Sequence, residues 1–224
     1  MSIASRARGR GLRLHCDAVQ AAGKLPIDIA ELGVDYLVIS GHKFGGPKGA
    51  GALVLGAGAP LEALQRGSAH EGGRRGGTEN VPGIVGLGVA AAAAAAELES
   101  ERHRLGELRE RLERGLLEAI PDAVIHAAAA ARLPNTVNVS IPGTRSDTML
   151  MALDARGFEV SAGAACASGA VEPSPVMKAM GVPRELAICA LRLSMGRTTS
   201  PADVDGLLRA IAESAAAARR RSPV

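Results

Sequence analysis

Apolar runs separated by glycine-rich turns make up the first half of the chain. Three of these runs have the length and composition of strands, at 12–16, 36–40 and 50–55. Continuous apolar character, rather than strict alternation, is typical of strands that helices cover on both faces. The pattern predicts an α/β domain with a mainly parallel sheet.

A helical period occupies the middle of the chain. It begins at Pro82, continues through the alanines at 90–96 and ends at about Ile120, before Pro121. In its second part the leucines follow the i, i+3, i+4 spacing of an amphipathic helix, at positions 98, 105, 108, 112, 116 and 117. We expect a long helix with one face packed against a core.

Shorter elements follow this helix. The strand-like runs lie at 123–126, 136–141, 158–162 and 191–194, and the helical ones at 147–155 and 201–218. Strands mixed with helices on this smaller scale indicate an α+β domain. We expect a boundary near residue 98, with 1–98 forming a partial large domain and 99–224 a small one. Two or three strands are too few for a doubly wound sheet, so the first domain is expected to be incomplete.

Composition and charge narrow the class of protein. The net charge is +3, and the arginines are interleaved with glutamates, as in 97–114, which predicts solvated helix faces rather than a nucleic-acid stripe. No stretch has the layout of a signal peptide or 18 consecutive apolar residues, which argues against a membrane span. Three well-separated cysteines fit a reducing cytosol. We expect a cytoplasmic protein that contacts neither nucleic acid nor membrane directly.

Polar side chains follow two of the apolar runs. Asp17 and Gln20 come after the first run, and Ser40, His42 and Lys43 come after the second. Such positions line the ligand crevice of open α/β sheets. Pyridoxal phosphate (PLP) needs an amine for a Schiff base, a carboxylate for its ring nitrogen and donors for its phosphate.

Each of these requirements has a candidate residue. Lys43 could supply the amine and Asp17 the carboxylate, while Ser40 and His42 could bind the phosphate. Gln20 could hydrogen-bond the phenolic oxygen of the cofactor. Taken singly, Lys43 could instead be a surface lysine, and Asp17 could be a helix N-cap.

Four motifs in this order resemble the cysteine desulfurase family, within the class V, fold-type I PLP-dependent enzymes. Residues 15–53 resemble the cofactor segment of this family, and they read HCDAVQAAGKLPIDIAELGVDYLVISGHKFGGPKGAGAL. Residues 74–80, which read RRGGTEN, resemble a second motif of the family. Residues 160–181 resemble the active-cysteine loop of the NifS/IscS-like group, and they read VSAGAACASGAVEPSPVMKAMG. Residues 191–197, which read LRLSMGR, resemble the family's substrate-carboxylate strand.

The resemblance implies a role for each site residue. Lys43 would carry PLP and shuttle the α-proton of L-cysteine, with His42 as a further proton carrier. Cys166 would attack the substrate sulfur and become a persulfide as L-alanine leaves. Thr78 would reach the PLP phosphate of the neighbouring subunit in a homodimer, and Arg192 would bind the substrate carboxylate. Cys16 and Cys189 lie in apolar runs, and we assign both to the core.

The same resemblance implies partners. The sulfur would pass to an iron–sulfur scaffold or to another acceptor protein, such as one of tRNA thiolation, and Cys166 could meet a scaffold-bound cluster through its persulfide. No metal site of the chain's own is expected. Relatives also carry a longer front part, so we expect this chain to be a truncated version. Two other hypotheses stay open: a selenocysteine lyase or other class V enzyme, and a non-catalytic remnant that binds a partner chain.

Overall fold

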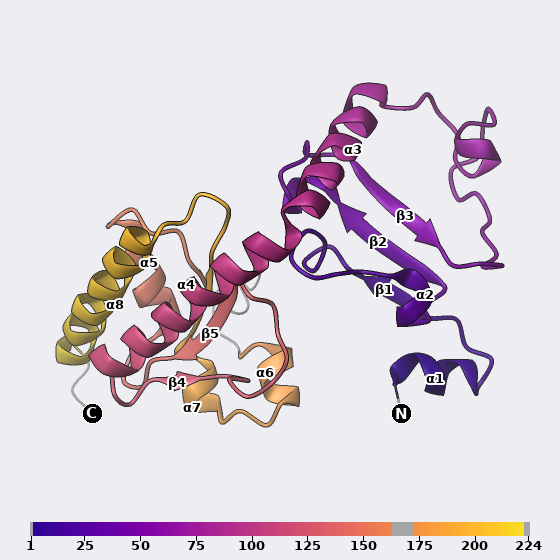
Figure 1. Cartoon of the computed structure of the whole chain (residues 1–224). Coiled ribbons are helices and arrows are strands. Elements are labelled where there is room, and N and C mark those ends of the chain that lie inside the picture. The colour runs from indigo at the N-terminus through magenta and orange to yellow at the C-terminus, as the bar shows by residue number, and fades with distance from the viewer. Residues whose placement is uncertain (1, 163–172, 222–224) are drawn as a thin grey trace. The chain divides into compact units, whose positions relative to one another are not determined.

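The chain forms two compact units in a computed structural model that describes residues 2–162 and 173–221 (Figure 1). Unit 1 is Met1–Ser100, and unit 2 is Glu101–Val224. The α/β class predicted from the apolar runs is confirmed, because strands and helices occur in both units.

Unit 1 is built on a three-stranded sheet in the order β1-β2-β3. The strands are β1 (His15–Asp17), β2 (Tyr36–Ser40) and β3 (Gly51–Leu55). Its helices are α1 (Ile3–Arg8), α2 (Ile29–Leu32) and α3 (Val81–Ala96), and the 3-10 turns are η1 (Gly41–Lys43) and η2 (Glu71–Gly73).

The sheet of unit 1 is mixed rather than mainly parallel, which corrects the prediction. β1 and β2 are parallel, but β2 and β3 are antiparallel, with Ser40 opposite Gly51. Residues 41–50 connect β2 to β3, and this length is too short for the crossover that a parallel pair requires. The direction of β3 therefore follows from the length of its loop.

The first strand begins later than its apolar run. Residues 12–14 precede β1, because the Leu14 amide donates to the Asp35 carboxylate (2.8 Å) instead of joining a strand ladder. Arg13 donates to the other oxygen of Asp35 (2.7 Å). Asp35 thus fixes the entry to β1 and β2 from a position just before β2.

Unit 2 contains an antiparallel sheet in the order β4-β5-β7-β6. The strands are β4 (Val124–Ile125), β5 (Thr136–Ser140), β6 (Ser161–Ala162) and β7 (Ala190–Ser194). The helices are α4 (Leu98–Ala119), α5 (Ser146–Asp154), α6 (Pro175–Ala179), α7 (Arg184–Ala187) and α8 (Pro201–Arg221).

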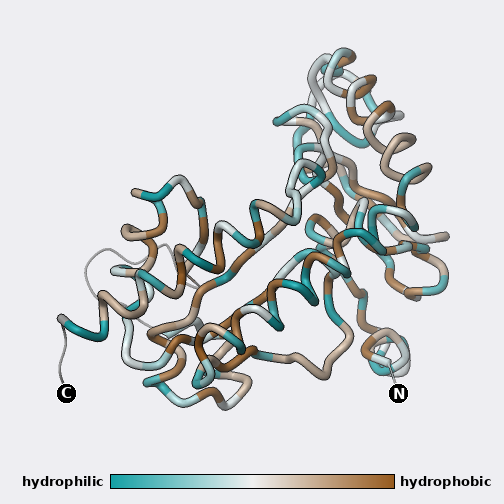
Figure 2. Tube along the Cα trace, turned by 60° about the vertical axis from the view of Figure 1, so that its left-hand side comes forward, coloured by the Kyte–Doolittle hydropathy of each residue, from teal (hydrophilic) through white to brown (hydrophobic). Residues whose placement is uncertain are grey.

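One face of this sheet forms the core of unit 2. Val137, Val139, Leu191 and Leu193 alternate along β5 and β7 and are buried in one cluster. The buried leucines of α4 and apolar residues of α5 and α8 complete the cluster. The long helices of this unit show the matching alternation of hydrophobic and hydrophilic residues (Figure 2).

The predicted long helix is two helices. α3 ends at Ala96 and α4 begins at Leu98, and Glu97 between them has φ −100° and ψ 0°, outside the α-helical region. Neither glycine nor proline marks this break in the sequence. Among the described residues no single helix is long and apolar enough to cross a membrane, although α3 and α4 taken together satisfy that length and composition.

Candidate functional site

Two segments that carry predicted cofactor residues leave the sheet of unit 1 at the same edge. Asp17 ends β1, and Ser40 ends β2 and leads directly into η1, which contains Lys43. β1 and β2 are parallel with Asp17 opposite Val38, and the Ala18 amide donates to the Val38 carbonyl (3.0 Å). Carboxyl ends of parallel strands are where open α/β sheets bind ligands.

The side chains at this edge have unused hydrogen-bonding capacity. The Asp17 Oδ1 atom accepts from the Val19 amide (2.9 Å), and its Oδ2 atom bonds to no described residue. Gln20 and Lys43 are exposed, and neither side chain has a hydrogen-bond partner among the residues that the structure describes. These groups are therefore available to a ligand.

Ser40 and His42 form a pair beside Lys43. The Ser40 Oγ and His42 Nδ1 atoms lie 2.8 Å apart, so one donates to the other according to the tautomer of the imidazole. An oriented hydroxyl and imidazole next to an amine can together bind an anionic group. The predicted phosphate donors are thus adjacent in space as well as in sequence.

The loop after Lys43 is tightly folded. The Gly46 amide donates to the Gly41 carbonyl (2.8 Å), and the Gly41 amide donates to the Ala50 carbonyl (2.9 Å). A Cβ at Gly46 would lie 3.1 Å from the Gly41 backbone, so a larger residue there would push this turn open. These two hydrogen bonds close the loop after Lys43 and hold η1 beside the residue that precedes β3.

Thr78 lies in a loop that Glu79 organises. The Glu79 Oε2 atom lies 2.8 Å from His70 Nδ1, and Oε1 accepts from the Glu71 amide (3.3 Å). The amides of Glu79 itself and of Glu71 keep the pKa of this carboxyl below its usual value. Glu71 has a left-handed φ of 51°, which costs a non-glycine residue energy, and these bonds help to hold it.

Glu79 was not among the predicted site residues. The signal available in sequence was its position directly after Thr78 in RRGGTEN. The Thr78 side chain itself is exposed, and it bonds to no described residue.

Arg192 lies on β7 in unit 2, on the sheet face opposite the core. Its register partners are Asn138 on β5 and Ser161 on β6, so the three side chains form a row across the sheet. Arg192 Nη2 donates to Ser161 Oγ (3.3 Å), and Arg192 is otherwise exposed. A guanidinium held at one side only can take a carboxylate in its planar fork.

Asn138 is a further residue that sequence reasoning missed. Its Oδ1 atom is buried and finds no hydrogen-bond partner in the described part of the chain. A buried polar atom without a partner is costly and calls for an explanation, such as a ligand or a partner side chain. Only the strand register reveals its position beside Arg192.

The cysteines fall into different surroundings. Cys166 lies outside the described residues. Cys189 is buried, its Sγ donates to the carbonyls of Glu185 and Leu186 (3.3 Å each), and burial raises its pKa. The assignment of Cys189 to the core is confirmed, and a thiol with a raised pKa is a poor nucleophile. Cys16 is only half-buried, so the expectation that it belongs to the core is not confirmed.

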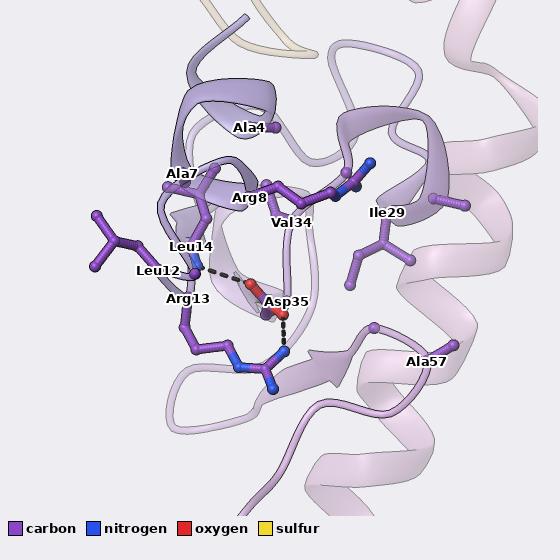
Figure 3. Close-up of a pocket in the computed structure, with 14 residues that line it drawn as sticks. Ala4, Ala7, Arg8, Leu12, Arg13, Leu14, Ile29, Val34, Asp35 and Ala57 are labelled. Carbon is purple, nitrogen blue, oxygen red and sulfur yellow. Dashed lines mark hydrogen bonds and ion pairs between the residues drawn. The ribbon is translucent and has the colours of Figure 1, made fainter.

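A cavity of about 530 Å³ lies at the other end of β1 and β2 (Figure 3). It is lined by residues of α1, of the entry to β1 and of the turn before β2. Asp35 projects between Leu14 and Arg13 in this region, and both of its oxygens are used by them. The Leu14 amide and then Arg13 lower the pKa of Asp35. These contacts are structural, and the cavity contains none of the predicted site residues.

The residues at the carboxyl edge of β1 and β2 fit PLP by chemistry. They offer an exposed amine, a carboxylate with one unpaired oxygen, and a paired hydroxyl and imidazole. Within the described ranges no group of three His, Cys, Asp or Glu side chains lies close enough together to hold a metal ion.

The sequence is similar to those of known proteins. The sequence matches the aminotransferase class-V family over residues 1–207. A cysteine desulfurase of Gluconacetobacter diazotrophicus is 44% identical over 222 residues, which cover 99% of this chain and 56% of that protein. Cysteine desulfurase IscS of Methanosarcina thermophila is also 44% identical, over 99% of this chain and 55% of that protein.

Solved structures give the same result. The crystal structure of a NifS-like protein from Rickettsia africae matches with a TM-score of 0.84 at 32% identity. The match covers 95% of this chain and 56% of that one. The chain therefore spans about half the length of the curated relatives and the solved structure that it matches.

Proposed function

Because the chain belongs to the aminotransferase class-V family, we propose that it carries the cofactor-lysine and sulfur-acceptor parts of a PLP-dependent cysteine desulfurase. The observation that carries the proposal is the placement of Asp17 and Lys43 after two parallel strands, at one edge of the sheet. The names of its relatives support the reaction, and the motif order supports the residues.

Each residue of unit 1 would have a distinct task. PLP, when bound, supplies an electron sink that weakens the Cβ–S bond of cysteine. Lys43 would hold the cofactor and, as a free amine, move the α-proton of the substrate. The unpaired oxygen of Asp17 would keep the ring nitrogen protonated, and Gln20 would donate to the phenolic oxygen. Ser40 and His42 would bind the phosphate.

Two residues beyond residue 100 would handle the substrate. Arg192 would take the α-carboxylate of L-cysteine in its guanidinium fork. The thiolate of Cys166 would attack the substrate sulfur, so that an S–S bond forms as the Cβ–S bond breaks. The carbon skeleton keeps the electron pair, gains a proton at Cβ and leaves as L-alanine, and the sulfur stays on Cys166 as a persulfide.

The proposal extends to the partners that the sequence resemblance implies. Thr78 would serve the phosphate of a neighbouring subunit in a homodimer, and an iron–sulfur scaffold or another acceptor protein would collect the sulfur in the cytoplasm. A relative named IscS supports the family assignment behind these partners. Ultracentrifugation of the chain with and without PLP tests the dimer.

The first test is cofactor attachment. We expect the chain to develop a visible absorbance band with PLP, and borohydride to fix the cofactor to Lys43 alone among Lys24, Lys43, Lys48 and Lys178. Lys43→Ala should lose the label, and the matched variant Lys48→Ala should keep it. Peptide mass mapping reads the result. Label on Lys48 would contradict the assignment of Lys43, and no label on the chain at all would favour a non-catalytic partner-binding role.

The second part of the test separates sulfur transfer from elimination. With L-cysteine, Cys166→Ser should still take up PLP but form no persulfide, whereas Cys189→Ser should behave like the parent chain. Release of sulfide by Cys166→Ser at the parent rate would favour a lyase, including a selenocysteine lyase.

A further inference from the structure

We propose that Lys24 is a positioning residue that fixes the backbone of Lys43, and this inference rests on the proposed cofactor role of Lys43. The Lys24 Nζ atom donates to the carbonyl of Lys43 (3.3 Å) and to that of Gln20 (3.2 Å). One ammonium therefore joins the turn after β1 to the turn after β2. Hydrogen bonds from a charged donor are stronger than neutral ones.

The backbone turn that carries Lys24 is closed by hydrogen bonds and anchored by buried residues. The turn that carries it is closed by the Ala22 amide, which donates to the Ala18 carbonyl (2.9 Å), and by the Lys24 amide, which donates to the Ala21 carbonyl (2.9 Å). Ala18 and Ala22 are buried, so this turn is anchored in unit 1. Lys24 is itself half-buried.

The residue before Lys24 engages the residue after Lys43. Gly23 has φ +73°, and a Cβ there would lie 2.7 Å from the Cβ of Phe44. A larger residue at this position would push Phe44 away, and the left-handed backbone also favours glycine. Two neighbouring residues thus contact the segment at 43–44 in two independent ways. Gly23 packs closely against Phe44, and Lys24 donates a charged hydrogen bond to the Lys43 carbonyl.

The contacts of Gly23 and Lys24 connect the two turns that carry the proposed cofactor residues. Asp17 ends β1, and Gln20 lies in the turn that follows it. The Lys24 ammonium donates to the carbonyl of Gln20 in this turn and to the carbonyl of Lys43 in the other turn. Asp17 would meet the ring nitrogen and Lys43 the reactive carbon of one rigid molecule, so their spacing must be constant. Burial and then the nearby charge of Lys43 lower the pKa of Lys24, which agrees with two cations held close together.

Hydrogen exchange tests the positioning role directly. In Lys24→Met the amides of Phe44 and Gly46, which both donate to the Gly41 carbonyl, should exchange about tenfold faster than in the parent chain. Lys24→Arg keeps a cation and should retain part of the protection. Gly23→Ala should deprotect the same two amides. Lys48→Met is the matched control, because Lys48 is exposed and bonds to no described residue, and it should leave both rates unchanged.

Cofactor trapping tests the consequence of that positioning. With limiting PLP, the borohydride-fixed label on Lys43 should form about tenfold more slowly in Lys24→Met, and Lys24→Arg should recover part of the rate. Unchanged amide exchange in both Lys24→Met and Gly23→Ala would overturn the inference. Faster exchange with an unchanged trapping rate would overturn its link to the cofactor. If the parent chain takes no PLP, the proposed function fails for this chain, and the exchange rates alone decide whether Lys24 fixes Lys43.

Discussion

The two units differ in where their apolar side chains lie. In unit 1 only Ala18, Ala22 and Leu37 are buried hydrophobic residues among those described, and the extended core clusters all belong to unit 2. Unit 1 instead exposes many large apolar side chains, including Val85 (59%) and Val89 (67%) on α3. Most of the predicted cofactor chemistry therefore lies on the unit with the smaller core.

The difference teaches that most of the predicted cofactor residues lie outside the part of the chain with the larger buried core. Regions with few buried apolar contacts open at low free energy, whereas a closed core resists opening. We expect unit 1 to respond strongly to ligands and to neighbouring protein surface, because binding adds the contacts that its own residues do not supply. Unit 2 should behave as a self-sufficient small domain.

A matched pair of leucine truncations gives the largest effect. Leu112 in unit 2 and Leu37 in unit 1 are both buried, but Leu112 is surrounded by a full core. We expect Leu112→Ala to cost about 4 kcal/mol in unfolding free energy and Leu37→Ala about 2 kcal/mol, because a thin core collapses onto the cavity more easily.

Urea titration can follow each unit separately. Tyr36 is the one tyrosine of the sequence, it lies in unit 1, and its hydroxyl donates to the Pro60 carbonyl (2.6 Å), so its fluorescence reports that unit. Circular dichroism of the helices reports mostly unit 2, which contains the two longest described helices, α4 and α8. Equal costs for the two substitutions would show that unit 1 has a core as effective as that of unit 2.

A pH titration gives a smaller effect, confined to unit 2. Ser140 Oγ donates its one proton to the Leu186 carbonyl (2.6 Å), so His126 Nε2, 2.6 Å from that oxygen, must carry a proton and donate to it. Burial lowers the pKa of His126, so the unfolded chain binds the extra proton more readily than the folded chain.

The sign of the effect follows from this difference. The stability of unit 2 should be constant above the usual histidine pKa of about 6.5 and should fall as the pH drops below it. His126→Gln should flatten this slope, and His103→Gln, at an exposed position on α4, should leave it in place. Urea midpoints between pH 5 and pH 8 measure both, and a slope that survives in His126→Gln would contradict the assignment.

The smallest effect on folding is expected on the surface of α3. Replacing Val85 and Val89 by Ser should change the unfolding free energy little, because both are exposed. It should nevertheless reduce self-association of the chain, since a contiguous apolar face drives contact between molecules. Sedimentation velocity measures the change, and Met151→Ser on the exposed face of α5 is the control. Unchanged self-association of the Val85 and Val89 variant would show that the exposed face of α3 does not drive contact between molecules.

The strands and the longer helices could be predicted because local pattern determines them, whereas the short helices α2, α6 and α7 were not predicted. The run at 36–40 became β2 with the same bounds, since charged or glycine residues flank it. The start of β1 could not be predicted, because a carboxylate at Asp35, distant in sequence, takes the Leu14 amide. The antiparallel direction of β3 and the break at Glu97 also depend on tertiary context rather than on composition.

For the site, residue types could be predicted but supporting contacts could not. Motif order identified Lys43, Asp17 and Arg192, and their roles stay predictions. Lys24 meets Lys43 across the gap between two turns, and Asn138 meets Arg192 only through strand register. Neither relation leaves a periodic signal in the sequence.

The row on β7 has a mechanical consequence. Arg192 lies between Leu191 and Leu193, which are packed into the core on the reverse face of the same strand. The strand that carries the guanidinium is therefore held on its other face by the buried core of unit 2. Lys43 lies instead on a 3-10 turn whose backbone is held by hydrogen bonds, among them the one from Lys24. A carboxylate bound at Arg192 would therefore rest on side-chain packing, whereas a group bound at Lys43 would rest on backbone hydrogen bonds.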